Sequence, residues 1–416
     1  MIALTIAVAT TSILLTLVAA GTLWWMMHAW RMPEVYESIH GPLDDQPQLG
    51  FSLIVPCREE SEAVMGETIR RLLSQEHPDF EIIISVGHDD EETIAAARNI
   101  AATDDRVRVA VNHDEHKNKP RQLNSTLLTC TKPIVGIFDA ESLAAPGLLR
   151  KVDSTFRDPD THVVQGAVHL VNLRSRWFSL RNCLEYRIWF RSRLHGHADN
   201  GFVPLGGNTV FFRRELLLEV DGWDGDCLAE DCEIGVRLSV LGKRTVCVYE
   251  SELVTREETP DTVSAFIKQR TRWALGFMQV MAKGEWRNLP TRSERARALW
   301  LLSQQYAAAF SGIVLPLAVI TAVLGNLPVL VVLLSFLPLM TAIMTLGFEV
   351  LILHEFGRDM GARVGLRDYV WLVLSTPFYQ VLLAIAAVRA VVKYVRGNFS
   401  WEKTAHVGAH LEGSAA

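Results

Sequence analysis

The sequence lacks the two glycine-rich patterns that mark many nucleotide-binding sites. It contains neither G-x-G-x-x-G nor G-x-x-x-x-G-K followed by Ser or Thr. The first pattern packs a dinucleotide pyrophosphate against a helix N-terminus, and the second wraps a loop around nucleotide phosphates. A dinucleotide cofactor is therefore disfavoured, and a P-loop is excluded.

Cysteine and net charge are also low. The six cysteines form neither a C-x-x-C pair nor a zinc-like spacing, which favours reduced thiols in the cytoplasm. His113 and His116 lie in the polar stretch "NHDEHKNK", which is typical of a solvated surface rather than a metal site. The formal net charge of -6 is mild, so we expect no affinity of the whole chain for nucleic acid.

Long hydrophobic runs lie near the two ends of the chain. Residues 2–27 carry no charge and can cross a bilayer as a helix; they lack the basic start and shorter core of a signal peptide. Arg31 follows this run, so the positive-inside tendency places the next segment in the cytoplasm. Residues 299–325 and 327–353 predict two more spans, joined by a tight turn at 325–328.

The last apolar run, residues 369–395, is compatible with two topologies. Basic residues flank both its ends: Arg358, Arg363 and Arg367 before it, and Lys393, Arg396 and Lys403 after it. A simple crossing would place one of these groups outside the cell, against the positive-inside tendency. The break at Ser375-Thr376-Pro377 allows an interfacial or re-entrant helix pair instead, with a cytoplasmic tail. We favour this second topology.

Between the hydrophobic ends, residues 50–290 have the pattern of one α/β domain. Continuous apolar runs predict strands at 51–56, 80–87, 107–111 and 133–139. Helix-compatible segments separate most of these runs, which is typical of a doubly wound, mostly parallel, Rossmann-like sheet. We therefore divide the chain into an N-terminal membrane helix at 1–30, this domain, a C-terminal membrane domain at 296–396 and a tail at 397–416.

Polar side chains gather where the predicted strands end. They are Arg58, Glu59, Asp89, Asp90, Lys119, Asp139 and Glu141. The carboxyl ends of strands form the ligand crevice in open α/β sheets, so this shared placement predicts one polar cleft. Unrelated solvated turns are the alternative, and the joint placement of seven polar residues argues against it.

Asp139 and Glu141 are two positions apart at the end of a buried run. In an extended segment such side chains point to the same side, and their carboxylates repel unless a cation or donors lie between them. Mg²⁺ takes one or two carboxylates and completes its shell with phosphate oxygens and water. The pair therefore fits a metal-bound diphosphate such as that of a nucleotide-sugar, near which Lys119 could add positive charge.

Two later segments predict helices with reactive side chains. The stretch "AED" (229–231) opens an amphipathic helix, where acids are often only partners of the helix dipole, but Asp231 also fits a general base. The stretch "QRTRW" places Gln269, Arg272 and Trp273 close together on a helix. Arg272 could stabilise a departing diphosphate, and Trp273 could pack against a sugar ring. An ordinary amphipathic helix at the membrane surface is the alternative.

Seven short motifs, in their order and spacing, resemble the membrane-embedded family 2 glycosyltransferases. They are "VPCREE", "HDD", "NKPRQLN", "DAE", "GGN", "AED" and "QRTRW". That family includes cellulose, hyaluronan and poly-N-acetylglucosamine synthases and ceramide glucosyltransferase. The resemblance covers roughly residues 50–290 and extends into the flanking spans. The tail "FSWEKTAHVG" is also similar to the ending of bacterial members.

The resemblance implies a GT-A fold, a UDP-sugar donor, Mg²⁺ or Mn²⁺, and inversion at the anomeric carbon. By position it implies a nucleotide site of Pro56, Glu59, Asp89, Asp90, Lys119 and Asp139, metal contacts of Asp139 and Glu141, a catalytic base Asp231, and a diphosphate and acceptor site of Gln269, Arg272 and Trp273. The second acid of the usual Asp-x-Asp is Glu141 here, and we expect its longer carboxylate still to reach a metal.

The acceptor remains open between two classes. A synthase that repeats the transfer to make a β-linked polysaccharide is favoured, and the alternative is transfer of one sugar to a ceramide-, diacylglycerol- or polyprenyl-type lipid. The "QRTRW" pattern occurs in both classes. The small number of predicted spans argues against a wide export channel within one monomer. A homo-oligomer could supply such a channel. A transporter or receptor would need ionisable residues deep in its spans, where Glu349 is the only obvious candidate.

The segment 174–197 is unusually rich in arginine, with six such residues among several aromatics. Trp177, Leu180, Leu184 and Ile188 recur at helical spacing, which predicts a helix with one face packed in the core and a basic outer face. The excess of arginine also suits contact with anionic headgroups or a lipid-linked acceptor.

Overall fold

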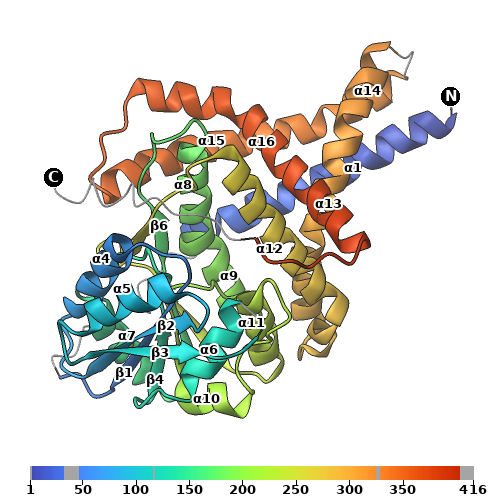
Figure 1. Cartoon of the computed structure of the whole chain (residues 1–416). Coiled ribbons are helices and arrows are strands. Elements are labelled where there is room, and N and C mark those ends of the chain that lie inside the picture. Colours follow the sequence, from blue (N-terminus) through green and yellow to red (C-terminus); the bar gives the residue numbers. More distant parts are fainter. Residues whose placement is uncertain (1, 32–45, 116–117, 325–327, 403–416) are drawn as a thin grey trace.

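The computed structural model describes residues 2–31, 46–115, 118–324 and 328–402, and its α/β domain is built around a seven-stranded sheet (Figure 1). The strands are β1 (Phe51–Cys57), β2 (Phe80–Gly87), β3 (Val107–Asn112), β4 (Ile134–Ile137), β5 (Thr161–Gly166), β7 (Val210–Arg213) and β8 (Arg244–Val248). Their order is β3-β2-β1-β4-β7-β5-β8, and β7 alone among them runs antiparallel to its neighbours. The predicted mostly parallel sheet is confirmed.

The sheet is buried on both faces because its strands are apolar on both faces. Alternate residues of β1 point to opposite sides, so that Leu53 and Val55 join one core and Ile54 joins the other. The first core is covered by α4 (Glu62–Leu73), α5 (Glu91–Ala101) and α7 (Leu148–Phe156). The second is covered by α6 (Lys119–Leu127), α10 (Arg214–Glu219) and α11 (Glu230–Val240). The domain therefore has three layers, with helices on each side of the sheet.

A small second sheet pairs β6 (Val168–Leu170) with β9 (Thr255–Glu257) in parallel. An isolated antiparallel bridge joins Leu143 to Arg256, so β9 lies beside the segment that follows β4. Neither strand was predicted, since three residues are too few to show a hydrophobic period. This pairing brings a distant part of the chain to the end of the main sheet.

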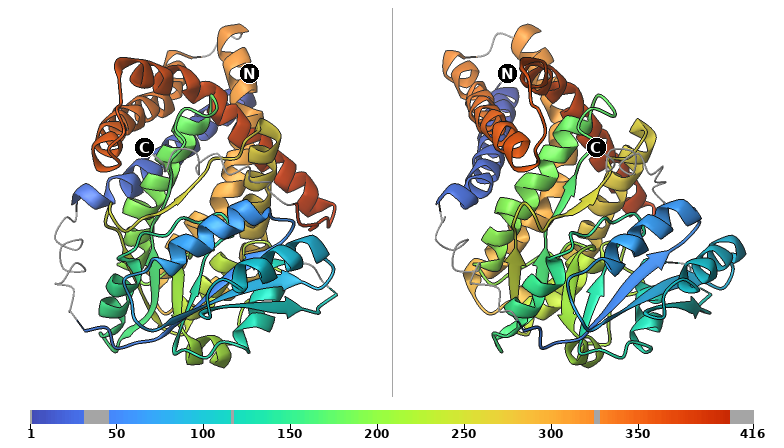
Figure 2. Two further views of the ribbon diagram at one scale, coloured as in Figure 1. Left: turned by 60° about the vertical axis from the view of Figure 1, so that its left-hand side comes forward. Right: turned by 90° about the vertical axis from the view of Figure 1, so that its left-hand side faces the viewer.

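The apolar helices gather at the end of the molecule opposite the sheet (Figure 2). They are α1 (Ile2–Met26), α13 (Arg292–Leu324), α14 (Val329–Ser335), α15 (Leu337–Asp359) and α16 (Leu366–Val395). Three stretches are long and apolar enough to cross a membrane, namely Thr5–Met26, Val329–Asp359 and Leu366–Val395. They correspond to the predicted runs at 2–27, 327–353 and 369–395. The run at 299–325 lies in α13 up to Leu324, and residues 325–327 of the predicted turn fall outside the described residues.

The predicted break at Ser375-Thr376-Pro377 is wrong. Pro377 lies inside one continuous helix, α16. Proline removes one backbone donor, but the neighbouring side chains remain bonded within the helix: the Thr376 hydroxyl donates to the Leu372 carbonyl at 2.7 Å. The segment is therefore a single helix and not a re-entrant pair. The tail from residue 403, including Lys403, lies outside the described residues.

The arginine-rich segment forms α8 (Ser179–Ile188), a π-helical turn η1 (Trp189–Arg193) and α9 (Leu194–Ala198). Leu180 and Leu184 of the predicted packing face are buried, but the predicted basic outer face is wrong, because Arg181 and Arg187 are buried as well. Three of its arginines bind acids of α15 in the pairs Arg181–Glu349, Arg187–Asp359 and Arg191–Glu355. Two more bind Asp368 and Asp261. These arginines fasten the α/β domain to the apolar helices, so lipid headgroups are not needed to explain them.

Candidate active site

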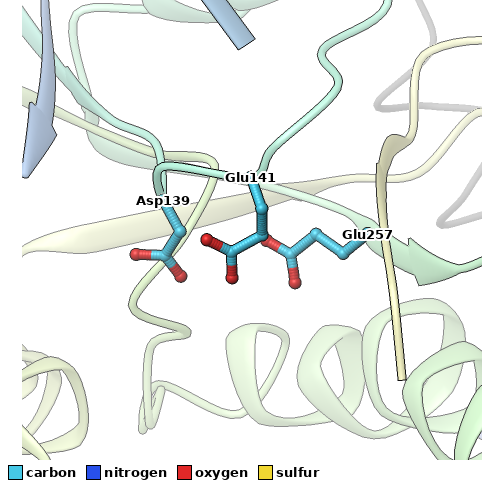
Figure 3. Close-up of side chains that lie close together, drawn as sticks. All are labelled: Asp139, Glu141 and Glu257. Carbon is cyan, nitrogen blue, oxygen red and sulfur yellow. The ribbon is translucent and has the colours of Figure 1, made fainter. Parts of the chain in front are cut away.

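Three carboxylates converge beyond the end of β4 (Figure 3). Asp139 and Glu141 come from the segment after β4, and Glu257 comes from the end of β9. One oxygen of each carboxylate lies within 4.8 Å of the others, and Glu141 and Glu257 are buried. This confirms the predicted convergence of Asp139 and Glu141 and adds a third acid to it.

Glu257 was not singled out from the sequence. It lies 116 positions after Glu141, in a stretch without local periodicity, and reaches the cluster through the pairing of β9. Ser142 donates a 3.0 Å hydrogen bond to its carboxylate, and the Asn208 amide, from the "GGN" motif, also bonds to it. The two adjacent glutamates in "TREETP" are the one local sequence feature that points to this position.

The electrostatics of this cluster favour a bound cation. Burial, together with the charges of Glu141 and Asp139, holds the pKa of Glu257 well above its ordinary value. Such repulsion between buried carboxylates is relieved by a proton or by a cation between them. Carboxylate oxygens are the ligands that Mg²⁺ and Mn²⁺ prefer, so the donor set fits a divalent ion of this kind.

Lys119 lies on the other side of Asp139. It begins α6, and its ammonium group binds both the Asp139 carboxylate and the Gly207 carbonyl, the latter at 2.8 Å. Burial alone would lower the pKa of the Lys119 ammonium group. The negative charges of Asp139, Glu230 and Asp231 have a larger effect, and they hold the pKa of Lys119 above its ordinary value. Lys119 therefore remains a fixed positive charge in the cleft.

Asp231 lies in the first turn of α11, as predicted. Burial raises the pKa of its carboxyl group, and the backbone N–H of Cys232 donates a 2.7 Å hydrogen bond to one of its oxygens. Gly207 packs directly against it, since a Cβ built on Gly207 would lie 3.1 Å from Asp231 Oδ2 and 3.4 Å from Lys119 Nζ. The "GGN" motif thus leaves room between the base candidate and the lysine.

The helix α12 (Val263–Lys283) carries the "QRTRW" residues to the same cleft. Burial raises the pKa of both Glu230 and Asp231, and the positive charge of Arg272 opposes each rise. Within the described part of the chain, Oε1 of the buried Gln269 and Nε of Arg272 have no hydrogen-bond partner. The Trp273 ring lies 6.2 Å from the Tyr186 ring, with the Arg270 guanidinium 4.8 Å from its centre. Polar atoms of α12 are therefore available to a ligand.

The residues expected around the nucleotide base form a separate group at the ends of β1 and β2. Asp89 binds the Arg58 guanidinium, with an Nη2–Oδ2 distance of 3.0 Å. Asp90 caps α5 and accepts hydrogen bonds from the backbone N–H groups of Thr93 and Glu59, and the result is a lowered pKa for its carboxyl group. Pro56 is within β1, opposite Ser85 of β2.

These two groups differ in how they are assembled. Asp139, Glu141, Lys119, Asp231 and Arg272 form one connected group: Lys119 joins the carboxylates to Asp231, and Asp231 interacts in turn with Arg272. Asp89, Asp90 and Arg58 bond among the neighbouring loops, and the Glu59 side chain points outward with 64% of its area exposed. Since β2, β1 and β4 are adjacent strands, the groups lie along one edge of the sheet. His113 stacks on His88, and His116 lies outside the described residues.

Comparison with protein families gives one match that covers more than half of the chain. Residues 47–276 match the family described as "Glycosyltransferase like family 2". This region contains all seven motifs, every strand from β1 to β9 and the part of α12 that carries the "QRTRW" residues.

Two curated relatives represent two kinds of acceptor. The chain is 26% identical over 245 residues to a beta-monoglucosyldiacylglycerol synthase from Trichormus variabilis, which covers 58% of this chain and 52% of that protein. It is 24% identical over 273 residues to a poly-beta-1,6-N-acetyl-D-glucosamine synthase from Staphylococcus epidermidis, which covers 63% and 62%. The matches thus span about half to three fifths of the relatives' own length.

One solved structure is similar over nearly the whole chain. It is a mannosyltransferase, PcManGT from Pyrobaculum calidifontis, in complex with GDP-Man and Mn²⁺. The TM-score is 0.60 at 20% sequence identity, and the match covers 92% of this chain and 99% of the other. At this identity the likeness shows the fold alone, and it confirms the expected GT-A architecture.

Proposed function

Because the chain belongs to the family 2 glycosyltransferases, we propose that it transfers a sugar from a UDP-sugar to a hydroxyl acceptor at a membrane, with inversion at the anomeric carbon. One observation carries the proposal. Three carboxylates lie beside Lys119, and Lys119 and Arg272 both act on Asp231, at the carboxyl end of β4 in a mostly parallel sheet. Lys119 and Arg272 provide positive charge that can stabilise a diphosphate, and Asp231 provides a base for a hydroxyl.

Asp139, Glu141 and Glu257 would hold the metal ion, Mg²⁺ or Mn²⁺. When bound there, the ion supplies positive charge to the diphosphate as it becomes a leaving group. Lys119, which is already fixed beside Asp139, would bind the nucleotide part of the same donor. We further propose that Pro56, Glu59, Asp89 and Asp90 line the site of the uracil, at the ends of β1 and β2.

Asp231 would act as the catalytic base. It accepts the proton of the acceptor hydroxyl while that oxygen bonds to the anomeric carbon, and the bond from this carbon to the diphosphate oxygen breaks. Burial raises the pKa of Asp231 and so makes its carboxylate a stronger base. One base is sufficient because attack from the opposite face forms no glycosyl-enzyme, unlike the paired carboxylates of a retaining hydrolase.

The α12 side chains would stabilise the leaving diphosphate and position the acceptor. Arg272 and Gln269 have polar atoms free of partners within the described residues, and Arg272 lies close enough to Asp231 to lower its pKa. Trp273 presents a ring beside Tyr186, which suits packing against the face of a sugar. We assign Arg272 to the transition-state charge and Gln269 and Trp273 to the diphosphate and acceptor site.

For the acceptor we propose a growing β-linked polysaccharide, with a glycolipid acceptor as the second candidate. The similarity to a poly-N-acetylglucosamine synthase supports the first, and the similarity to a glucosyldiacylglycerol synthase supports the second. In either case we propose a multi-pass protein of the cell membrane with residues 50–290 in the cytoplasm. Arg31, at the end of the short helix α2 (His28–Arg31) that follows α1, and the basic residues around α16 support this orientation.

The test is nucleotide release by the purified full chain in proteoliposomes, with a panel of UDP-sugars and either Mg²⁺ or Mn²⁺. Metal-dependent release with one UDP-sugar, abolished by EDTA and restored by the metal, is the expected result. Partition of radiolabelled product between organic solvent and water then separates a glycolipid from a polymer. Release that EDTA leaves unchanged, or that occurs only with GDP-sugars, would contradict the proposed donor complex.

A further inference from the structure

The inner face of α16 packs along the α/β domain over most of its length. Its buried residues follow one stripe: Asp368, Leu372, Ser375, Tyr379, Leu382, Ala386, Ala387 and Ala390. The stripe is bonded to the domain at both ends, since Arg174 binds Asp368 and the Thr271 hydroxyl of α12 donates to the Ala386 carbonyl at 3.3 Å. α16 therefore lies along α8 and α12 (Figure 1) and does not stand away from them.

The outer face of α16 is apolar and exposed. Its large side chains there are Leu366, Val370, Trp371, Val373, Leu374, Phe378, Val381, Ile385, Val392 and Val395, and Leu366 is 80% and Phe378 66% exposed. These positions recur every three or four residues, so they form one continuous stripe opposite the buried one. At a rise of 1.5 Å per residue the helix is about 45 Å long, so the stripe is large. Such a surface needs an apolar partner.

If α16 crossed the membrane, the helices packed against it would also enter the bilayer. The face that α16 covers belongs to α8, α12 and α13, and the first two of these contain Glu185, Arg270 and Arg272. Tyr379 of α16 donates a 2.7 Å hydrogen bond to Glu185, and Arg270 bonds to both residues. If α16 spanned the bilayer, these charged groups would enter the hydrocarbon, which is strongly unfavourable. A helix lying flat at the interface keeps them on the aqueous side.

A basic groove adjoins the first turn of α16. It has a volume of about 450 Å³ and is lined by Arg174, Arg363, Val364, Gly365, Arg367 and Asp368. Asp368 is bound by Arg174. Arg363 and Arg367 are exposed, and within the described residues neither guanidinium has a hydrogen bond or an ion pair. The groove thus carries an excess of positive charge next to the exposed apolar stripe and just after the stretch Val329–Asp359.

We propose that α16 lies in the plane of the membrane interface and that Arg363 and Arg367 bind the phosphate of an anionic phospholipid. The apolar stripe meets the acyl chains while the groove meets the headgroup, which is the pairing of surfaces expected of an interfacial helix. Because α16 also packs on α12, the bilayer surface supports the helix that carries Gln269, Arg272 and Trp273. This inference needs no assumption about the reaction.

The first experiment measures depth in the bilayer. Single cysteines replace Leu366, Leu374, Val381 and Val392, spin labels are attached, and oxygen and nickel-chelate accessibilities give the depth of each label in proteoliposomes. The native cysteines are all buried, which limits background labelling. Met344→Cys in the predicted span and Leu128→Cys in the α/β domain provide the deep and aqueous references. Four similar, shallow depths are expected, whereas a maximum at Leu374 and Val381 with shallow ends would overturn the in-plane helix.

The second experiment measures lipid preference. Spin-labelled phosphatidylglycerol and phosphatidylcholine report which lipid associates with the reconstituted full chain. We expect a preference for phosphatidylglycerol that falls about fivefold for each arginine removed in Arg363→Gln and Arg367→Gln. Arg98→Gln, an exposed arginine of α5, is the matched control and should change nothing. No preference in the wild-type chain, or an equal loss with Arg98→Gln, would overturn the headgroup site.

Discussion

The Ser142 hydroxyl donates a 3.0 Å hydrogen bond to Oε1 of Glu257, which joins β9 to the segment that carries Asp139 and Glu141. Asn208 bonds to both partners and so holds this contact from the "GGN" segment. Three stretches of chain that are far apart in sequence are thereby fixed around one cluster of carboxylates. The cluster is a property of the folded topology and not of any local motif.

Glu257→Gln should weaken metal binding by at least about tenfold, because the amide keeps the hydrogen bond from Ser142 but removes one anionic ligand from the cluster. The measurement is a titration with Mn²⁺ in which electron paramagnetic resonance reports the free ion. Glu252→Gln, an exposed acid a few residues earlier, serves as the control. Equal affinities of Glu257→Gln and wild type would remove Glu257 from the metal site.

The pH dependence of kcat should follow the ionisation of the Asp231 carboxyl group. The base must be ionised, and burial raises its pKa, so the rate should fall as the pH decreases through a value above that of an ordinary aspartate. The Lys119 charge opposes this rise. Lys119→Gln should therefore raise the pKa of Asp231 further and move the acid limb of kcat to higher pH, whatever its effect on the rate. Lys132→Gln, which changes a lysine that precedes β4 and pairs with Asp79 at the amino end of the strand, should leave the limb in place; a limb that stays fixed in Lys119→Gln contradicts the assignment.

Gly207→Ala should lower kcat by up to about 100-fold, since the new Cβ would press within 3.1 Å of Asp231 Oδ2 and displace the base. Thermal stability should change little because the neighbouring lysine can shift. The matched substitution is Gly66→Ala in α4, where a Cβ meets nothing within 4 Å and the activity should be unchanged. Unaltered kcat in Gly207→Ala would show that the cleft tolerates displacement of Asp231.

Arg187→Met should destabilise the attachment of the α/β domain to α15. Arg187 is 1% exposed and binds Asp359 and the Tyr249 hydroxyl, so its removal takes one partner from the half-buried Asp359, which keeps its contact with Arg358, and should cost about 1–3 kcal/mol. Thermal inactivation in detergent measures the loss. Arg98→Met is the exposed control, and the double variant Arg187→Met with Asp359→Leu should recover part of the stability. Wild-type inactivation of Arg187→Met would mean that the pair contributes nothing to docking.

The first four strands were predicted from their apolar runs, whereas β5, β7 and β8 of the main sheet and the short pair β6 and β9 were not. Phe51–Cys57 and Phe80–Gly87 are buried on both faces and therefore carry a continuous hydrophobic signal. β6 and β9 have three residues each, and their identity depends on pairing with each other. Glu257 was missed for this reason, since no spacing in the sequence connects it to Glu141.

For α16 the sequence predicted the hydrophobic helix itself but not its placement relative to the membrane. The hydrophobic run of α16 was evident, but its length and composition suit a span and an interfacial helix equally well. The buried stripe on α8 and α12 distinguishes the two, and it becomes visible only in the tertiary packing. Pro377 suggested a break that the structure does not contain, because proline limits one backbone bond and neighbouring packing can maintain the helix.

The most direct measurement of the central claim compares Asp231→Asn with Asp226→Asn in nucleotide release and in donor binding. Asp226 is in the loop before α11 with an 82% exposed side chain, so its substitution matches the chemical change outside the cleft. We predict that Asp231→Asn lowers the release rate by about 10²–10⁴-fold and leaves donor affinity near that of the wild type, while Asp226→Asn behaves as wild type in both. Release at the wild-type rate in Asp231→Asn would contradict the proposed reaction at this site.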